Sequence, residues 1–217
     1  MRDKEIHDVL SILREEYKKW KLPAVTRVAR RKDPFRVLVS TLISLRTKDE
    51  VTDDASKKLF RIADTPESMV KIPARDIEKA IYPAGFYRTK AKNIKRICSI
   101  ILDKYHGKVP DTIDELLTLP GVGRKTANLV VTLGYGKPGI CVDTHVHRVS
   151  NRLGYVSTKT PDKTEFALRD KLPPEYWIEY NDLLVTYGKY ICTPVSPFCS
   201  KCQLYRLCSR VGVTRTR

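Results

Sequence analysis

Apolar residues recur at a spacing of three and four along almost the whole chain, and this helical pattern restricts the possible folds more than any other feature. Glycine and proline divide the pattern into segments, and no two alternating stretches are joined by an Asn-Gly or Asp-Gly turn. The sequence therefore predicts an all-α protein. Residues 3–20 show the pattern most simply, with an apolar face made of Ile6, Val9, Leu10, Leu13, Tyr17 and Trp20.

Proline and glycine set the expected ends of the helices. Pro23 ends the first helix, and Asp33-Pro34 is typical of the start of the next. The apolar run from Phe35 to Leu45 fits a buried helix in length, although its β-branched residues alone would permit a strand. The polar, basic residues 209–217 are expected to fray. The further predicted helices are 49–62, 66–71, 74–81, 88–105, 112–118, 124–135, 143–153, 161–171 and 174–188.

The charge of the chain indicates the class of its partner. The 217 residues include 41 Lys and Arg against 25 Asp and Glu, which gives a net charge of +16. This excess favours a polyanion, and nucleic acid is favoured over a membrane because no basic amphipathic anchor is evident. No stretch reaches the roughly eighteen uncharged apolar residues of a spanning helix. The N-terminal residues include acids and do not resemble a secretory signal.

The six cysteines are unevenly distributed. Cys98 and Cys141 stand alone in apolar stretches and are expected in the core. The other four crowd near the C-terminus, which predicts a metal or iron–sulfur site in a reducing compartment rather than a set of disulfides. The spacing alone does not separate an iron–sulfur cluster from tetrahedral zinc. The crowded cysteines are Cys192, Cys199, Cys202 and Cys208.

A glycine-containing turn joins two of the predicted helices. Residues 112–131 read TIDELLTLPGVGRKTANLVV, so a helix ends near Leu117 and another begins at about Arg124. Gly121 and Gly123 permit positive φ and leave backbone N–H groups accessible, and N–H groups at a helix start suit a phosphate oxygen. An ordinary helix–helix turn is the alternative. A nucleotide P-loop is excluded because no strand precedes the turn and the Gly-Lys-Ser/Thr sequence is absent.

Three motifs in this order resemble one family. LPGVGRKTA at 119–127, followed by VDTH at 142–145, resembles the helix–hairpin–helix glycosylase superfamily. The C-x6-C-x2-C-x5-C spacing of the clustered cysteines resembles the iron–sulfur loop of its endonuclease III branch. Further similarity at 40–49, 83–94 and 105–110 extends the resemblance over nearly the whole chain.

The resemblance implies a two-domain, all-α helix–hairpin–helix glycosylase fold with a DNA cleft between the domains. One domain is expected to be a six-helix barrel over 24–137 that contains the helix–hairpin–helix motif at about 112–131. The other is expected to be discontinuous, to combine 1–23 with 138–217, and to hold a 4Fe-4S cluster in the loop 192–208. The implied ligands are the four clustered cysteines, and the expected role of the cluster is structural.

The resemblance also implies two catalytic residues. Lys125 occupies the position of the lysine that bifunctional family members use as a nucleophile on C1′, with a Schiff base and β-elimination to follow. Asp143, in VDTH, occupies the position of the aspartate that stabilises positive charge on the sugar. From the residues alone, Lys125 could instead contact a phosphate, and Asp143 could cap the helix that starts at Thr144. The implied contacts of the hairpin with DNA are Gly121, Gly123 and Arg124.

Base removal from a duplex requires the target nucleotide to be extruded, and the vacancy must be filled. By similarity, the loops at Arg46 and Phe86 do this. Many relatives have glutamine at the first position and leucine at the second, so this chain departs from the pattern, which puts the choice of damaged base and opposite base in doubt. Arginine can hydrogen-bond or stack on an orphaned base, and phenylalanine can wedge between bases. The alternatives are a surface cation and a core residue.

The expected function is a bifunctional DNA glycosylase and AP lyase of base excision repair that removes oxidised pyrimidines. One alternative is a mismatch glycosylase for thymine or uracil opposite guanine, and removal of 8-oxoguanine or adenine is weaker. From other classes, the alternatives are a non-catalytic DNA-binding module and an iron–sulfur electron carrier. We expect a monomer in the cytoplasm of a prokaryote, associated with the nucleoid, whose partner is double-stranded DNA with a damaged or abasic site.

Overall fold

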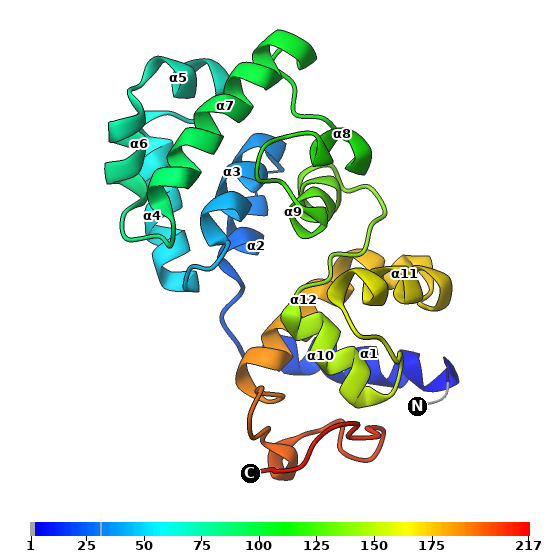
Figure 1. Ribbon diagram of the computed structural model, residues 1–217. Coiled ribbons are helices and arrows are strands. Elements are labelled where there is room, and N and C mark those ends of the chain that lie inside the picture. The colour runs from blue at the N-terminus through cyan, green and yellow to red at the C-terminus, as the bar shows by residue number, and fades with distance from the viewer. Residues whose placement is uncertain (1–2, 31) are drawn as a thin grey trace. The chain divides into compact units, whose positions relative to one another are not determined.

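A computed structural model of the chain describes residues 3–30 and 32–217 (Figure 1). Within these residues every regular element is helical and no strand is found, which confirms the all-α prediction. In the same residues, every helix is too short or too polar to cross a bilayer. The chain divides into two compact units: the hairpin unit, Ala24–Gly139, and the cysteine unit, which joins the N-terminal segment up to Pro23 to Ile140–Arg217.

The hairpin unit is built around one buried helix. Its helices are α2 (Ala24–Ala29), α3 (Pro34–Ser44), α4 (Asp49–Ile62), α5 (Pro66–Lys71), α6 (Ala74–Ile81), α7 (Tyr87–Tyr105), α8 (Ile113–Leu117) and α9 (Arg124–Leu129), and the π-helical turn η2 (Val130–Gly134) follows α9. Helix α3 contacts α2, α4, α7 and α9. The Asp33 carboxylate caps it by accepting hydrogen bonds from the N–H groups of Phe35 (2.9 Å) and Arg36 (3.1 Å). Helix rather than strand is therefore confirmed for this segment.

The cysteine unit places its apolar core between α1, α10 and α12. Its elements are η1 (Asp3–Glu5), α1 (Ile6–Tyr17), α10 (Thr144–Leu153), α11 (Pro161–Lys171), η3 (Pro174–Tyr176), α12 (Trp177–Tyr190) and η4 (Cys199–Lys201). Helix α12 contacts both α1 and α10. The core includes Leu10 of α1, Val146 of α10 and Leu184 of α12, all fully buried. The loop with the four clustered cysteines follows α12.

Two expectations about secondary structure were wrong. The sequence showed no helix between Pro23 and Asp33, but α2 lies there, and the N–H of Ala24 at its start donates to the Asp49 side chain (3.1 Å). The basic tail was expected to fray, but Arg217 is hydrogen-bonded through its N–H to Pro197 O (2.8 Å) and through its carbonyl to Ser200 N (3.1 Å). The tail therefore packs on the cysteine loop.

Candidate active site and candidate metal centre

The two glycines in the turn between α8 and α9 differ in backbone conformation and in surroundings. Gly121 has φ +77°, and a Cβ there would lie 2.7 Å from the Asn93 side-chain nitrogen, so the turn sits directly on α7. Gly123 caps α9 in an extended conformation, and a Cβ there would meet nothing within 4 Å. The Gly123 carbonyl accepts from the N–H of Ala127 (2.9 Å), which fixes the first turn of α9. The Gly123 side of the turn is thus open to a ligand.

Lys125 is the second residue of α9 and is half-buried. The next residues on the helix, from Thr126 to Leu129, are all buried, so the backbone beneath Lys125 is anchored in the hairpin unit. Arg124 precedes it at the first helical position. The side chain that the sequence predicts as a nucleophile is therefore presented from a fixed helical turn directly after the glycine turn.

Asp143 is the N-cap of α10. Its Oδ1 accepts hydrogen bonds from the N–H groups of His145 (2.8 Å) and Val146 (3.0 Å). The helix behind it is anchored by the buried Val146 and Val149. The cap that the sequence suggested is present, and it fixes the carboxylate at the positive end of a helix, where an anion is favoured.

The two histidines of α10 bond within the cysteine unit. His145 Nδ1 lies 3.1 Å from an Arg148 guanidinium nitrogen, and His147 Nδ1 lies 2.7 Å from Thr164 Oγ1. Burial lowers the pKa of both histidines, which favours the neutral imidazole. These contacts indicate structural roles for the two side chains.

Arg46 and Phe86 lie together in the hairpin unit. The Arg46 guanidinium carbon is 5.1 Å from the centre of the Phe86 ring, a cation–π contact. The Phe86 side chain is 63% exposed, which excludes a core role. Both residues have positive φ, +53° and +57°. The structure thus brings the two sequence-predicted loop residues into one exposed pair.

Sequence reasoning missed several residues next to this pair. The Tyr82 and Tyr87 rings meet edge to face with centres 5.4 Å apart, and the Arg88 guanidinium lies over Tyr87 at 4.8 Å. Tyr82 is 60% exposed. The run YPAGFYR is the one available signal, because three aromatic residues and an arginine around a Pro-Ala-Gly turn are unusual for a core segment. Lys90 is buried next to the loop that carries Arg46, and no sequence pattern marks it as a buried residue.

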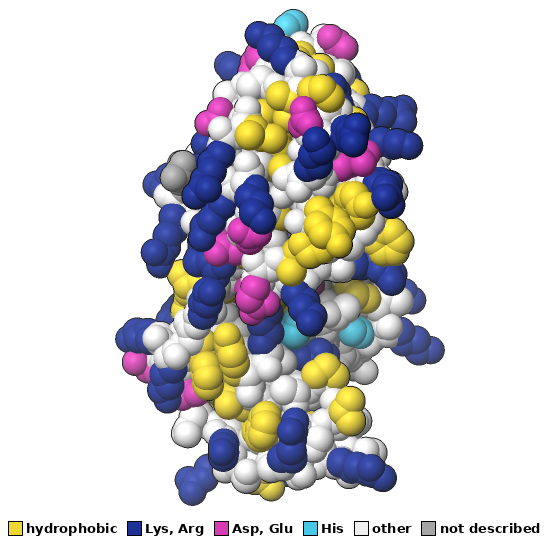
Figure 2. Space-filling view, turned by 90° about the vertical axis from the view of Figure 1, so that its left-hand side faces the viewer, with side chains coloured by type: hydrophobic (Ala, Val, Ile, Leu, Met, Phe, Trp, Pro, Cys, Tyr) yellow, Lys and Arg dark blue, Asp and Glu magenta, His cyan; other side chains and the backbone are white. Residues whose placement is uncertain are grey.

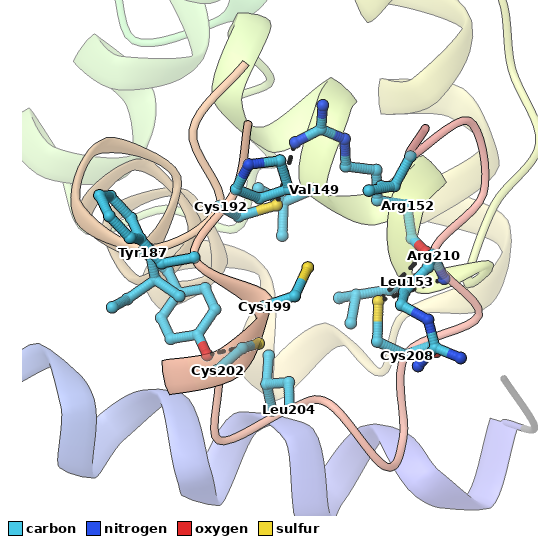
Figure 3. A pocket seen from close by; sticks show the side chains of 14 residues that line it. Val149, Arg152, Leu153, Tyr187, Cys192, Cys199, Cys202, Leu204, Cys208 and Arg210 are labelled. Atoms are coloured by element: carbon cyan, nitrogen blue, oxygen red, sulfur yellow. Dashed lines mark hydrogen bonds between the residues drawn. The ribbon is translucent and has the colours of Figure 1, made fainter. Parts of the chain in front are cut away.

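The four clustered cysteines line one pocket of the cysteine unit, and Figure 3 shows their side chains around it. The rest of the lining is mostly apolar and includes Val149, Leu153 and Leu204. Burial raises the pKa of the thiols of Cys199, Cys202 and Cys208, so bound positive charge would be needed to favour their thiolates.

Donor groups point at several of the sulfur atoms. Arg152 donates to Cys192 Sγ (3.5 Å), the N–H of Arg210 lies 3.4 Å from Cys208 Sγ, and the Tyr187 hydroxyl is 3.1 Å from Cys202 Sγ. Arg148 and Arg152 also bind backbone carbonyls of the loop at Cys192 and Thr193. Such donors stabilise thiolate sulfur in metal centres.

The arrangement of the sulfurs bears on the choice between zinc and a cluster. Zinc bonds thiolate at about 2.3 Å, so four tetrahedral ligands would lie within about 4 Å of each other. Among the described residues, which include all four cysteines, no three His, Cys, Asp or Glu side chains are grouped to hold a single metal ion. The four thiols nevertheless line one pocket together, as Figure 3 shows.

Positive charge is abundant on the face of the molecule that Figure 2 shows. On the face in Figure 2, Lys and Arg side chains greatly outnumber those of Asp and Glu. Several acids are paired with cations, as Asp53 is with Arg27 (3.1 Å) and Lys57 (3.0 Å). The excess of positive charge fits a polyanionic partner.

Lys125 belongs to the hairpin unit, and Asp143 belongs to the cysteine unit, as do the clustered cysteines. Arg46, Phe86, Gly121 and Gly123 share the hairpin unit with Lys125.

Comparison with known proteins identifies related sequences. The family described as "HhH-GPD superfamily base excision DNA repair protein" matches residues 39–174. Endonuclease III of Thermotoga maritima is 51% identical over 176 residues, which are 81% of this chain and 83% of the relative. Endonuclease III homolog 1, chloroplastic, of Arabidopsis thaliana is 44% identical over 183 residues, which are 80% of this chain and 48% of that longer protein.

Solved structures resemble the chain over almost its full length. A trapped endonuclease III–DNA covalent intermediate matches with a TM-score of 0.84 and 34% identity, covering 97% of both chains. A thermostable thymine-DNA glycosylase also matches with a TM-score of 0.84, at 25% identity, covering 95% of this chain and 96% of that one.

Proposed function

The chain belongs to the HhH-GPD superfamily of base excision DNA repair proteins and, within it, to the endonuclease III family, and from this premise we propose how its residues act. The protein is a base-excision-repair DNA glycosylase and AP lyase. One observation carries the assignment of residues: Lys125 follows the Leu119–Gly123 turn on the first turn of a buried helix, at the position where the family's bifunctional members have their nucleophile.

Lys125 is the proposed nucleophile. Its neutral amine attacks C1′ of the deoxyribose, and the damaged base departs with the electrons of the C1′–N bond and takes up a proton. The ring opens to a Schiff base between Lys125 and C1′. Loss of a proton from C2′ then expels the 3′ phosphate by β-elimination, and water releases the lysine. Support for this assignment comes from the motif and from the fixed helical turn beneath the residue.

Asp143 is the proposed electrostatic partner. As the C1′–N bond breaks, positive charge develops on the sugar, and a fixed carboxylate lowers the energy of that state. The cap hydrogen bonds of Asp143 hold its carboxylate at one place before the substrate arrives. Pre-organisation of this kind avoids reorganisation during the reaction.

Cys192, Cys199, Cys202 and Cys208 are the proposed ligands of a 4Fe-4S cluster. Their thiols line one pocket, donors point at three of the sulfurs, and the spacing of the four cysteines in the sequence matches the iron–sulfur loop of the family. When bound, the cluster supplies four metal–thiolate bonds that hold the loop 192–208 folded. The folded loop carries Lys201 and Arg206, and Arg210 directly follows it; these cations can then meet phosphates.

Five further proposed contacts with double-stranded DNA lie in the hairpin unit. Gly121, Gly123 and Arg124 bind backbone phosphate at the start of α9, where N–H groups and a guanidinium are presented. Arg46 and Phe86 fill the space left by the extruded nucleotide. Their exposure and their mutual contact support this assignment.

The proposed substrates are oxidised pyrimidines. The second candidate is a mismatch activity on thymine or uracil opposite guanine, and two observations favour it. A thymine-DNA glycosylase is among the similar structures, and Arg46 departs from the glutamine of many relatives. A monomeric state and a cytoplasmic, nucleoid-associated location in a prokaryote stay predictions.

A panel of duplexes separates these candidates. The panel contains thymine glycol, uracil and thymine opposite guanine, 8-oxoguanine and an abasic site, and base release and strand nicking are scored separately. The proposal expects release from thymine glycol and nicking at the abasic site. Release from mismatched thymine without release from thymine glycol would support the second candidate. Binding without either reaction would contradict both.

A further inference from the structure

Lys90, on the first turn of α7, lies beneath the pair formed by Arg46 and Phe86, and nothing in the proposed mechanism uses it. It is only 8% exposed. Lysine is almost never buried to this degree unless its ammonium group is satisfied by other groups. Three acceptors satisfy it here, and all three belong to the end of α3 and the loop that follows.

The ammonium group of Lys90 donates to Ile43 O (2.6 Å), Leu45 O (2.6 Å) and Thr47 Oγ1 (2.9 Å). Ile43 O is among the last carbonyls of α3, which lack partners within the helix and favour a cation nearby. Burial lowers the pKa of Lys90 to about 8, so the group is still mainly charged at neutral pH. These bonds fix the backbone on both sides of Arg46.

The helix that carries Lys90 also holds the second segment of the pair, because Phe86 is the N-cap of α7. The backbone N–H of Lys90 donates to Phe86 O (3.0 Å), which is the first backbone hydrogen bond of the helix. The two segments touch directly as well, because Gly85 N–H donates to Thr47 Oγ1 (3.1 Å). A Cβ at Gly85 would lie 2.5 Å from Arg46 O, so this approach requires glycine. Lys90 and Thr47 are thus the links between the two loops.

Both residues of the pair have a backbone conformation that needs such support. Positive φ values are unfavourable for residues other than glycine. They persist where surrounding contacts hold the backbone in place. Arg46 and Phe86 have φ of +53° and +57°. The contacts that hold them are those of Lys90, Gly85 and Thr47.

We propose that Lys90 is a positioning residue that joins the loop Leu45–Lys48 to the turn Gly85–Phe86, so that Arg46 and Phe86 enter the duplex as one unit. The inference rests on the proposed role of this pair in base extrusion. Lys90 touches neither the sugar nor the base and acts through the two loops. Its loss therefore impairs reactions that need extrusion and spares the chemistry of Lys125.

The test compares Lys90→Met with Lys95→Met. Methionine keeps most of the length and the apolar stem of lysine but cannot donate hydrogen bonds. Lys95 is the matched control, because it lies on the same helix and its ammonium donates to a carbonyl, Ile72 O (2.6 Å), that is remote in sequence from both loops. Each variant is first compared with the unmodified protein by thermal unfolding.

Two substrates separate positioning from chemistry. One is a duplex with 2-aminopurine opposite a tetrahydrofuran abasic analogue, whose fluorescence at saturating protein reports unstacking of the orphaned base. The other is an abasic oligonucleotide, trapped with borohydride as a duplex and as a single strand. For Lys90→Met we expect a smaller fluorescence change and duplex trapping slower by about tenfold or more. Single-strand trapping should stay within about twofold of the unmodified protein, as should all values for Lys95→Met.

Two results would overturn the proposal. If Lys90→Met and Lys95→Met give the same fluorescence change and the same trapping rate on the duplex, the only role of Lys90 is to bind the carbonyls at the end of α3. If it loses single-strand and duplex trapping equally, the damage lies in the fold or in the Lys125 site. Phe86→Ala distinguishes a failure of the proposed DNA contact: if this variant keeps full fluorescence change and duplex trapping, the role of the pair itself is wrong.

If Lys90→Met does not fold, the variant Thr47→Val tests the proposal in its place. This nearly isosteric change removes the hydroxyl that accepts from both Lys90 and Gly85. The proposal predicts the same selective loss on the duplex, smaller in size because two acceptors of Lys90 remain. Duplex trapping equal to that of the unmodified protein would contradict it.

Discussion

The Asp143 carboxylate has an observed role in folding and a proposed role in catalysis. Through Oδ1 it satisfies two N–H groups at the start of α10, and through its charge it is proposed to stabilise the sugar cation. These contributions are separable, since asparagine is as good an N-cap as aspartate but carries no charge.

We predict that Asp143→Asn keeps the stability of the protein but slows base release by about a hundredfold or more, as loss of one electrostatic group does in other enzymes. Asp143→Ala should show the same slow release and, in addition, lose about 1 kcal/mol of unfolding free energy because the cap is gone. Single-turnover base release and chemical denaturation measure the two effects. Near-normal release by Asp143→Asn would show that its charge is not needed.

Lys90 predicts a dependence of stability on pH. Its pKa falls from 10.5 to about 8 in the folded protein because it is buried. Between pH 8 and 10.5 the unfolded chain therefore binds more protons at this residue, so its contribution to the unfolding free energy rises with pH. The difference in unfolding free energy between the unmodified protein and Lys90→Met should grow from pH 7.5 to pH 10. A constant or shrinking difference would contradict the assigned burial.

Single residues also mark the limit of sequence reasoning. The clustered cysteines, Lys125 and Asp143 can be proposed from the sequence because their motifs are local. Lys90 cannot, since its three acceptors lie more than forty residues away in the chain and a lysine in YRTKAKNI reads as a surface residue. The positive φ of Arg46 and Phe86 is set by the same distant contacts, so no residue preference reveals it.

Among the elements, the hairpin shows two glycines under different constraints. Gly121 has positive φ and lies against Asn93, whereas Gly123 is extended and faces open space. A methyl group added at Gly121 would strain the turn, whereas one added at Gly123 would contact only a bound ligand.

Alanine substitutions test this difference. We expect Gly121→Ala to lower the unfolding free energy by more than about 1 kcal/mol, because the strain adds to the clash with Asn93. Gly123→Ala should unfold at nearly the same temperature as the unmodified protein but bind duplex DNA more weakly. Calorimetry and binding titrations at a fixed salt concentration measure these effects. Unchanged DNA affinity for Gly123→Ala would contradict close approach of phosphate at this turn.

Helix prediction succeeded where caps and proline are explicit and failed where they are not. Asp33-Pro34 and Thr65-Pro66 begin α3 and α5 as the sequence indicates. Helix α2 has only six residues, too few to show a period, and depends on the Asp49 side chain at its start. The segment after α9 was expected to continue as an ordinary helix but forms the π-helical turn η2, which packs on α3.

At the scale of the whole molecule, each unit supplies a different part of the proposed activity. The hairpin unit carries the proposed nucleophile and the DNA-inserting pair, and the cysteine unit carries the capping aspartate and the proposed cluster. The cysteine unit is discontinuous in sequence, so its two segments must associate before its core is complete. The pocket of clustered cysteines lies beside this core.

We predict that the purified protein is yellow-brown, absorbs near about 400 nm and contains about four iron atoms per chain. Cys202→Ser should lose the colour and unfold at a lower temperature, because the loop loses its metal–thiolate bonds. Cys98→Ala is the control, since Cys98 is fully buried in the hairpin unit and should keep the colour. A colourless protein with one zinc per chain would contradict the cluster.

The proposed mechanism requires that Lys125 bonds covalently to deoxyribose. Borohydride trapping on an abasic duplex, followed by digestion and mass spectrometry of the cross-linked peptide, tests it most directly. We predict one adduct, attached to Lys125, which is lost in Lys125→Gln and retained in Lys137→Gln. An adduct that persists in Lys125→Gln, or that maps to another amine in the unmodified protein, would contradict the assignment.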